Sequence, residues 1–125
     1  MIIASPKLVK ENPQAIKAFL SAFTKGAKEA MANPDAAVET IKARDGIANI
    51  ALEQRRFKMA INDVIASPDA RAEGFGQVNP ARLTLMASQV SDAFATKTRV
   101  NPDAVWNGSF LPAKAELNVL PAARK

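Results

Sequence analysis

Two short patterns in the sequence contain residue types that form binding or modification sites. Gly74-Phe75-Gly76 precedes a predicted helix, and glycines at such a place can arrange backbone N–H groups around an anion. The pattern has neither the preceding strand nor the third glycine of a phosphate-binding loop, so a turn with positive φ at one or both glycines explains it better. Asn107-Gly108-Ser109 has the form of a glycosylation acceptor. That form has meaning only in a eukaryotic secretory setting, and a turn also explains it.

Aromatic and charged side chains supply the remaining candidates for a site. Trp106 and Phe110 either line a ligand pocket or pack the C-terminal segment onto the core, and the prevalence of aromatic residues in cores favours packing. We predict no catalytic, metal-ligating or cofactor-binding residue, and the ligand-binding residues are unknown. Two further pairs are interpreted as ordinary helix-surface groups: Glu53 with Arg55, and Gln89 with Asp92.

Three chemically versatile residue types are absent, because the chain has no His, no Cys and no Tyr. Without His, the Ser–His and Cys–His pairs of nucleophilic catalysis cannot form. Without Cys and His, there is no structural zinc site, iron–sulfur cluster or usual haem ligation. Carboxylates, lysines and hydroxyls remain, and these need strong tuning by burial to act as catalysts. The composition therefore predicts a protein that is not an enzyme and carries no cofactor.

The charge balance is basic, with a net charge of +5 and a pI near 9.8. This balance suggests nucleic acid or an anionic membrane as a partner, but acidic residues are interspersed among the basic ones. The densest basic cluster, Arg55, Arg56 and Lys58, projects on different sides of a helix. No apolar stretch approaches the ~18 residues that span a bilayer. We therefore predict a solvated surface, no nucleic-acid partner and no membrane insertion.

Proline placement predicts where helices begin. Asn-Pro occurs four times and Ser-Pro twice, and an Asn or Ser cap followed by Pro in the first helical turn is typical of a helix start. Alanine, the commonest residue with 25 copies, also favours helix. Apolar residues recur at helical spacing after Pro13, after Pro34, over residues 49–67 and after Pro80. The sequence predicts a mostly α chain of five or six helices, with one short N-terminal strand at Ile2-Ile3-Ala4.

The other segments are less regular. Residues 74–78 are predicted to form a loop or a short extended bridge, and residues 103–106 a short helical turn. From Pro112 onward the chain is weakly amphipathic, and we expect it to become ordered only against a partner surface.

Several loosely defined motifs follow one another in order from Ile2 to about Leu111. They are Ile3-Ala4-Ser5-Pro6-Lys7-Leu8-Val9-Lys10-Glu11-Asn12-Pro13, Ala18-Phe19-Leu20 with Ala22, Asn33-Pro34-Asp35-Ala36-Ala37, Glu53 with Arg56, Val64-Ile65-Ala66-Ser67-Pro68, Gly74-Phe75-Gly76-Gln77-Val78, Ala81-Arg82-Leu83, and Phe110-Leu111-Pro112. The series resembles the C-terminal part of substrate-binding proteins of ABC importers. It is most similar to the nitrate/sulfonate/taurine group, which includes the binding proteins for thiamine pyrimidine precursors and riboflavin.

The resemblance implies a fragment of a non-catalytic receptor for a small organic or anionic nutrient of the sulfonate, nitrate or vitamin-precursor type. Such receptors have a type 2 periplasmic binding fold, in which two α/β lobes close around the ligand. Residues 1–111 would form a helical C-terminal segment of one lobe, in which Ile2-Ile3-Ala4 ends a returning strand, and residues 112–125 would form a C-terminal tail. Most cleft residues would precede Met1, so the resemblance assigns no ligand-binding residue in this chain.

The resemblance also implies partners and a location. The partners would be a small-molecule ligand and an ABC permease, and the location would be periplasmic or extracytoplasmic, with the signal peptide upstream of this chain. If the chain exists alone, we expect its apolar helix faces to drive self-association. The alternative is a stand-alone α-helical protein-interaction module, which would cover its own apolar faces. A nucleic-acid-binding domain is suggested only by the pI and predicts a steep loss of affinity with salt.

Overall fold

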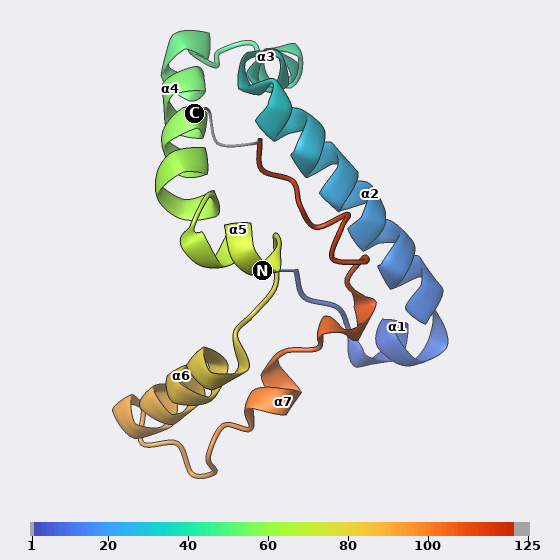
Figure 1. Ribbon diagram of the computed structural model, residues 1–125, viewed down its shortest axis with the longest axis vertical. Coiled ribbons are helices and arrows are strands. Elements are labelled where there is room, and N and C mark those ends of the chain that lie inside the picture. Colours follow the sequence, from blue (N-terminus) through green and yellow to red (C-terminus); the bar gives the residue numbers. More distant parts are fainter. Residues whose placement is uncertain (1, 122–125) are drawn as a thin grey trace.

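The computed structural model describes residues 2–121, and its regular elements are all helical (Figure 1). A π-helix, η1 (Ile61–Ile65), extends the fourth α-helix, and a short 3-10 helix, η2 (Gly108–Phe110), follows the last one. The prediction of a mostly α chain is confirmed, but the described residues form seven α-helices rather than five or six. These are α1 (Pro6–Glu11), α2 (Pro13–Ala32), α3 (Pro34–Arg44), α4 (Ile50–Ala60), α5 (Pro68–Glu73), α6 (Pro80–Ala93) and α7 (Pro102–Val105).

Local capping explains where these helices begin. At all six Asn-Pro and Ser-Pro sites, the Asn or Ser side chain accepts a hydrogen bond from a backbone N–H of the first turn, and Pro follows it. Proline suits this position because its φ is already helical and the missing N–H would have no partner there. The start of α4 uses the same cap without a proline, since Asn49 Oδ1 accepts from Leu52 N at 3.1 Å. The six proline sites and this cap at Asn49 together account for the starts of all seven α-helices.

The prediction of an N-terminal strand at Ile2-Ile3-Ala4 is wrong. These three residues have no regular structure, and no strand occurs within residues 2–121. A β-strand is stabilised by hydrogen bonds to a neighbouring strand, and the described part of the chain provides none. Ile3 is consequently 81% exposed.

The C-terminal segment lies inside the fold. Figure 1 shows residues 111–121 running between α2 on one side and α4 and α5 on the other. Leu117 and Val38 are the largest fully buried side chains, each only 1% exposed, and Val119 is 2% exposed. The expectation that the segment from Pro112 needs a partner surface is therefore wrong for residues 112–121, while residues 122–125 lie outside the described residues. The proposed boundary between residues 111 and 112 stays a prediction.

Helices α6 and α7 project from the rest of the molecule, at the end opposite to α3 (Figure 1). The buried hydroxyl of Ser91 links α6 to the chain that leads into α7. Ser91 Oγ donates to Ala87 O at 2.8 Å and accepts from Val100 N at 2.9 Å. This link uses one side of α6 and leaves other sides of the helix open.

The molecule exposes far more surface than a compact protein of its mass. A folded monomer of 13.3 kDa is expected to expose roughly 6,500 Å², whereas this chain exposes 9530 Å². The excess of roughly 3,000 Å² includes many large apolar side chains. Those that are exposed are Ile2, Ile3, Leu8, Phe19, Phe23, Ile41, Ile47, Met59, Val64, Leu85, Met86, Val90, Phe94 and Val105.

Candidate functional site

The loop between α5 and α6 brings the two glycines of the Gly-Phe-Gly pattern against the C-terminal segment. Gly74 and Gly76 have φ values of 105° and 85°, so the predicted positive-φ turn is confirmed. Two backbone N–H groups of the pattern already have partners within the chain: Gly74 N donates to Ala70 O, and Phe75 N donates to Leu117 O at 2.8 Å. These N–H groups are consequently not available to an anion, and the loop instead holds the C-terminal segment in place.

A hollow lies beside this loop, and we call it the glycine-loop hollow. It has a volume of about 470 Å³ and lies among η1, α5, the loop and the first turns of α6. Its apolar lining includes Val64, Phe75 and Met86. Arg82 Nη1 on α6 lies 3.2 Å from Asp69 Oδ2 on α5, and both residues also line the hollow. The hollow therefore offers an apolar surface beside an ion pair that joins two helices.

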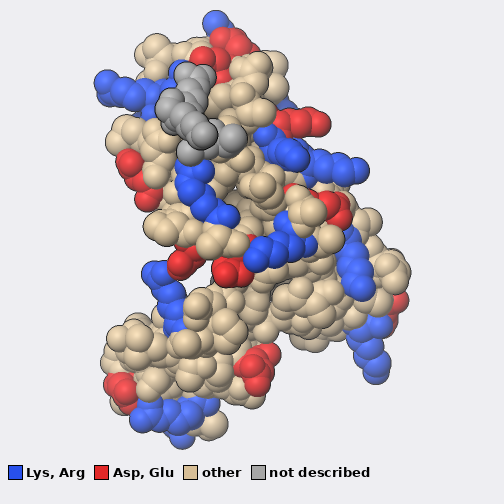
Figure 2. Space-filling view, in the orientation of Figure 1, with Lys and Arg blue, Asp and Glu red and all other residues tan. Residues whose placement is uncertain are grey.

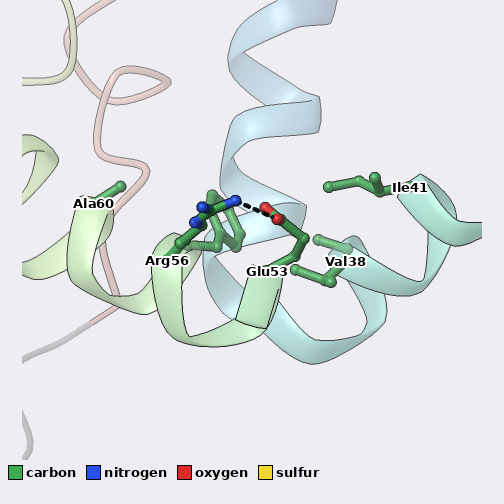
Figure 3. Close-up of a pocket in the computed structure, with 7 residues that line it drawn as sticks. Val38, Ile41, Glu53, Arg56 and Ala60 are labelled. Atoms are coloured by element: carbon green, nitrogen blue, oxygen red, sulfur yellow. Dashed lines mark hydrogen bonds and ion pairs between the residues drawn. The ribbon is translucent and has the colours of Figure 1, made fainter. Parts of the chain in front are cut away.

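A second hollow, of about 310 Å³, lies between α3 and α4 and is lined by residues of both helices (Figure 3). Five of its seven lining residues are apolar, and the other two are Glu53 and Arg56. Figure 3 shows these two side chains pointing toward each other, with Arg56 Nη1 2.7 Å from Glu53 Oε1. Arg56 is largely exposed, so water and salt screen this pair. The site can accept an apolar group beside a charge, and its lining contains no Ser, Thr, Cys, Lys or His nucleophile.

Glu53 and Asp92, which are interpreted from the sequence as ordinary helix-surface groups, each form an ion pair in the structure. Glu53 pairs with Arg56 rather than with its neighbour Arg55, because residues three apart face each other on a helix. Asp92 pairs with Arg99 at 2.6 Å, and this pair joins α6 to the following loop. The partner of Asp92 could not be found from helical spacing, because Arg99 lies beyond the end of α6.

The C-terminal aromatic residues are only half-buried. Trp106 precedes a turn in which Asn107 Oδ1 accepts from Ser109 N at 3.0 Å, and Phe110 is the last residue of that turn. The turn, η2, contacts α2. This contact supports the interpretation that Trp106 and Phe110 help to pack the C-terminal segment, and neither residue lines the two hollows described above.

Charged side chains of both signs are interspersed on the face shown in Figure 2. Several ion pairs join different elements, such as Lys58 Nζ with Asp35 Oδ1 at 2.8 Å between α4 and α3. Lys114 Nζ similarly lies 3.3 Å from Glu73 Oε2, between the C-terminal segment and α5. This mixed pattern confirms the predicted interspersion of acidic and basic groups on that face.

Residues 2–121 lack two further features that would indicate a function. No group of three or more Asp or Glu side chains is placed to hold a metal ion. None of the helices in this range combines the length and apolar character needed to cross a membrane.

Comparison with known proteins relates one end of the chain to a family. Residues 1–37 match the family described as NMT1/THI5 like. The match covers α1, α2 and the beginning of α3, including the caps at Ser5, Asn12 and Asn33. No curated protein and no solved structure matches the chain. The partial match supports a relation to substrate-binding proteins of ABC importers. The glycine-loop hollow lies beyond the matched residues, and the hollow between α3 and α4 shares only Ala37 with them.

Proposed function

We propose that this chain is a segment of the extracytoplasmic solute-binding component of an ABC importer for a small organic or anionic nutrient. The observation that carries the proposal is the match of residues 1–37 to the NMT1/THI5 like family, whose members are mostly binding proteins. The absence of His, Cys and Tyr from the sequence supports a non-catalytic role. The substrate class within the proposal is a sulfonate, nitrate or vitamin precursor.

The exposed surface supports a segment that packs against further structure. The excess of roughly 3,000 Å² is larger than the roughly 800 Å² that each partner contributes to a standard interface. Part of it lies within the matched residues, where Ile3, Leu8, Phe19 and Phe23 are all exposed. Phe19 and Phe23 are also neighbours, with ring centroids 6.3 Å apart. Exposed apolar side chains of this kind are suited to pack against an α/β lobe.

In the proposed whole protein, the two lobes close around the ligand and the membrane permease recognises the closed form. Residues 1–111 contribute helical scaffold to one lobe, and residues 112–125 form its tail. The burial of Leu117 and Val119 supports a structural rather than ligand-binding role for the tail.

The first experiment is to sequence the DNA upstream of the codon for Met1. An in-frame coding stretch that leads back to a signal peptide supports the proposal. The whole protein is then expressed and titrated with nitrate, taurine, an aminopyrimidine and riboflavin, with calorimetry as the measurement. A stop codon shortly before Met1, or a whole protein that binds none of these four compounds, contradicts it.

A stand-alone helical interaction module is the second candidate, and one observation favours it. Two of the three most buried apolar side chains, Leu117 and Val119, come from the C-terminal segment of this same chain, and the third is Val38 of α3, so the chain closes a core of its own. This candidate predicts that the 125-residue chain unfolds cooperatively and captures a protein partner. Cooperative unfolding is measured by circular dichroism, and its absence contradicts the module.

A further inference from the structure

Among the ion pairs described within residues 2–121, the least exposed charged side chain lines the hollow between α3 and α4. This side chain is Glu53, which is 28% exposed, whereas every other side chain in these pairs is 51–81% exposed. A carboxylate that is partly withdrawn from water attracts a nearby cation more strongly than a fully exposed one does. The pair of Glu53 with Arg56 is consequently screened by water mainly on the side of Arg56.

This ion pair uses only part of its capacity for hydrogen bonds. Arg56 Nη1 donates to Glu53 Oε1 at 2.7 Å, and this is the hydrogen bond that the two side chains make within residues 2–121. A guanidinium has five N–H donors, and a carboxylate has two acceptor oxygens. The second oxygen of Glu53 and further N–H groups of Arg56 can therefore bind a ligand. In Figure 3 the two charged ends lie between Ile41 of α3 and Ala60 of α4.

The rest of the lining is apolar and leaves room for a small side chain. It consists of Ala37, Val38, Ile41, Phe57 and Ala60. Val38 is only 1% exposed, so the hollow extends to one of the most buried side chains of the chain. The ion pair of Lys58 with Asp35, at 2.8 Å, joins α4 to α3 beside it. The volume of about 310 Å³ lies at the lower end of the range for small-molecule sites.

We propose that this hollow binds a free α-amino acid with an aliphatic side chain, such as leucine. An α-amino acid carries its ammonium and its carboxylate on one carbon atom, so the two groups can reach both members of a pair whose charged atoms are 2.7 Å apart. The ammonium donates to Glu53, and the carboxylate accepts from Arg56. The aliphatic side chain lies against Val38, Ile41 and Phe57.

A match to both charges distinguishes this ligand from others of similar size. An aliphatic carboxylate or amine carries one of the two charges and leaves the other member of the pair unmatched. The end of a peptide likewise carries only one of them. A zwitterion with an aliphatic side chain is therefore the class of ligand that complements both the pair and the apolar lining. The inference does not rest on the proposed importer function.

The first test titrates the full 125-residue chain with L-leucine and follows the backbone amides by NMR. We expect saturable shifts at Val38, Ile41 and Phe57, and unchanged amides in α6. N-acetyl-L-leucine lacks the ammonium, L-leucinamide lacks the carboxylate, and glycine lacks the aliphatic side chain. Each should bind at least about tenfold more weakly than L-leucine. Absence of saturable shifts at these amides, or equal affinity for L-leucine and glycine, overturns the proposal.

The second test alters the charged pair. Arg56→Gln should weaken L-leucine binding at least about tenfold, whereas the matched control Arg55→Gln, at an exposed position outside the lining, should bind as the wild type does. Glu53→Gln removes the partner of the ammonium and releases Arg56, so E53Q should bind N-acetyl-L-leucine more tightly than the wild type does. Circular dichroism verifies that the variants remain helical. Equal affinities of R56Q and R55Q for L-leucine, or an E53Q variant with the wild-type preference, contradicts the proposed recognition.

Discussion

A Cβ added to Gly74 would lie 2.8 Å from the Cβ of Leu117. The backbone of the loop after α5 therefore packs directly against the C-terminal segment. Beside this contact, Phe75 N donates to Leu117 O at 2.8 Å. The φ of Gly74, 105°, also lies in the region that other residues rarely adopt. Position 74 therefore requires glycine for two reasons: the backbone conformation, and the space that a missing side chain leaves for Leu117.

Gly74→Ala is expected to lower the free energy of unfolding by about 1–3 kcal/mol, because alanine is strained at this φ and its Cβ displaces Leu117. Gly26→Ala is the matched control, since Gly26 lies inside α2 with no atom within 4 Å of an added Cβ. The control should raise the free energy of unfolding by about 0.5–1 kcal/mol through helix propensity. Urea unfolding measures the free energy of unfolding of both variants. If both variants change it in the same direction, the requirement for glycine at position 74 is contradicted.

Leu117→Ala is expected to lower the free energy of unfolding by about 2–5 kcal/mol, because it leaves a cavity at a side chain that is 1% exposed. Ile47→Ala, at a 94% exposed position, should change it by less than about 0.5 kcal/mol. Thermal unfolding followed by circular dichroism compares the two variants. Similar melting temperatures would show that the C-terminal segment does not contribute to the core.

Ser91→Ala is expected to lower the free energy of unfolding by about 1–3 kcal/mol, because it leaves Val100 N without its acceptor. The loss should be local to α6 and α7, so hydrogen exchange at the Val100 amide should accelerate. Thr84→Ala serves as the control, since the Thr84 hydroxyl is exposed and bonds only to Pro80 O within the same helix. Unchanged exchange at Val100 in S91A would contradict the linking role of Ser91.

Asn79→Ala removes the side chain that accepts from Arg82 N at 3.2 Å, at the start of α6. We expect a loss of about 1 kcal/mol in the free energy of unfolding, and Asn79→Asp should retain most of the stability because aspartate also caps helices. Asn62→Ala, within η1, tests asparagine loss at an exposed position inside a helical segment. If N79A and N62A lose equal stability, capping does not explain the preference for Asn at residue 79.

Short-range chemistry made the helix starts predictable from the sequence. A cap hydrogen bond joins residues two or three positions apart, as Asn101 Oδ1 with Asp103 N does at 3.0 Å, so the residues that decide it are neighbours in the chain. The glycine turn was predictable for the same reason. The absence of His, Cys and Tyr is fixed by the sequence, because no fold can supply a side chain that the chain does not contain.

Interactions between distant residues were decided only by the tertiary structure. Leu117 follows no strong periodic pattern, and its burial depends on the space that Gly74 leaves far away in the sequence. Ile2-Ile3-Ala4 has the composition of a strand, but a strand requires a partner, and residues 2–121 supply none. Local hydrogen bonds and helix propensity are encoded within a few residues. The core, the ion pairs between elements and the exposed apolar side chains of α6 instead depend on which segments the whole chain brings together.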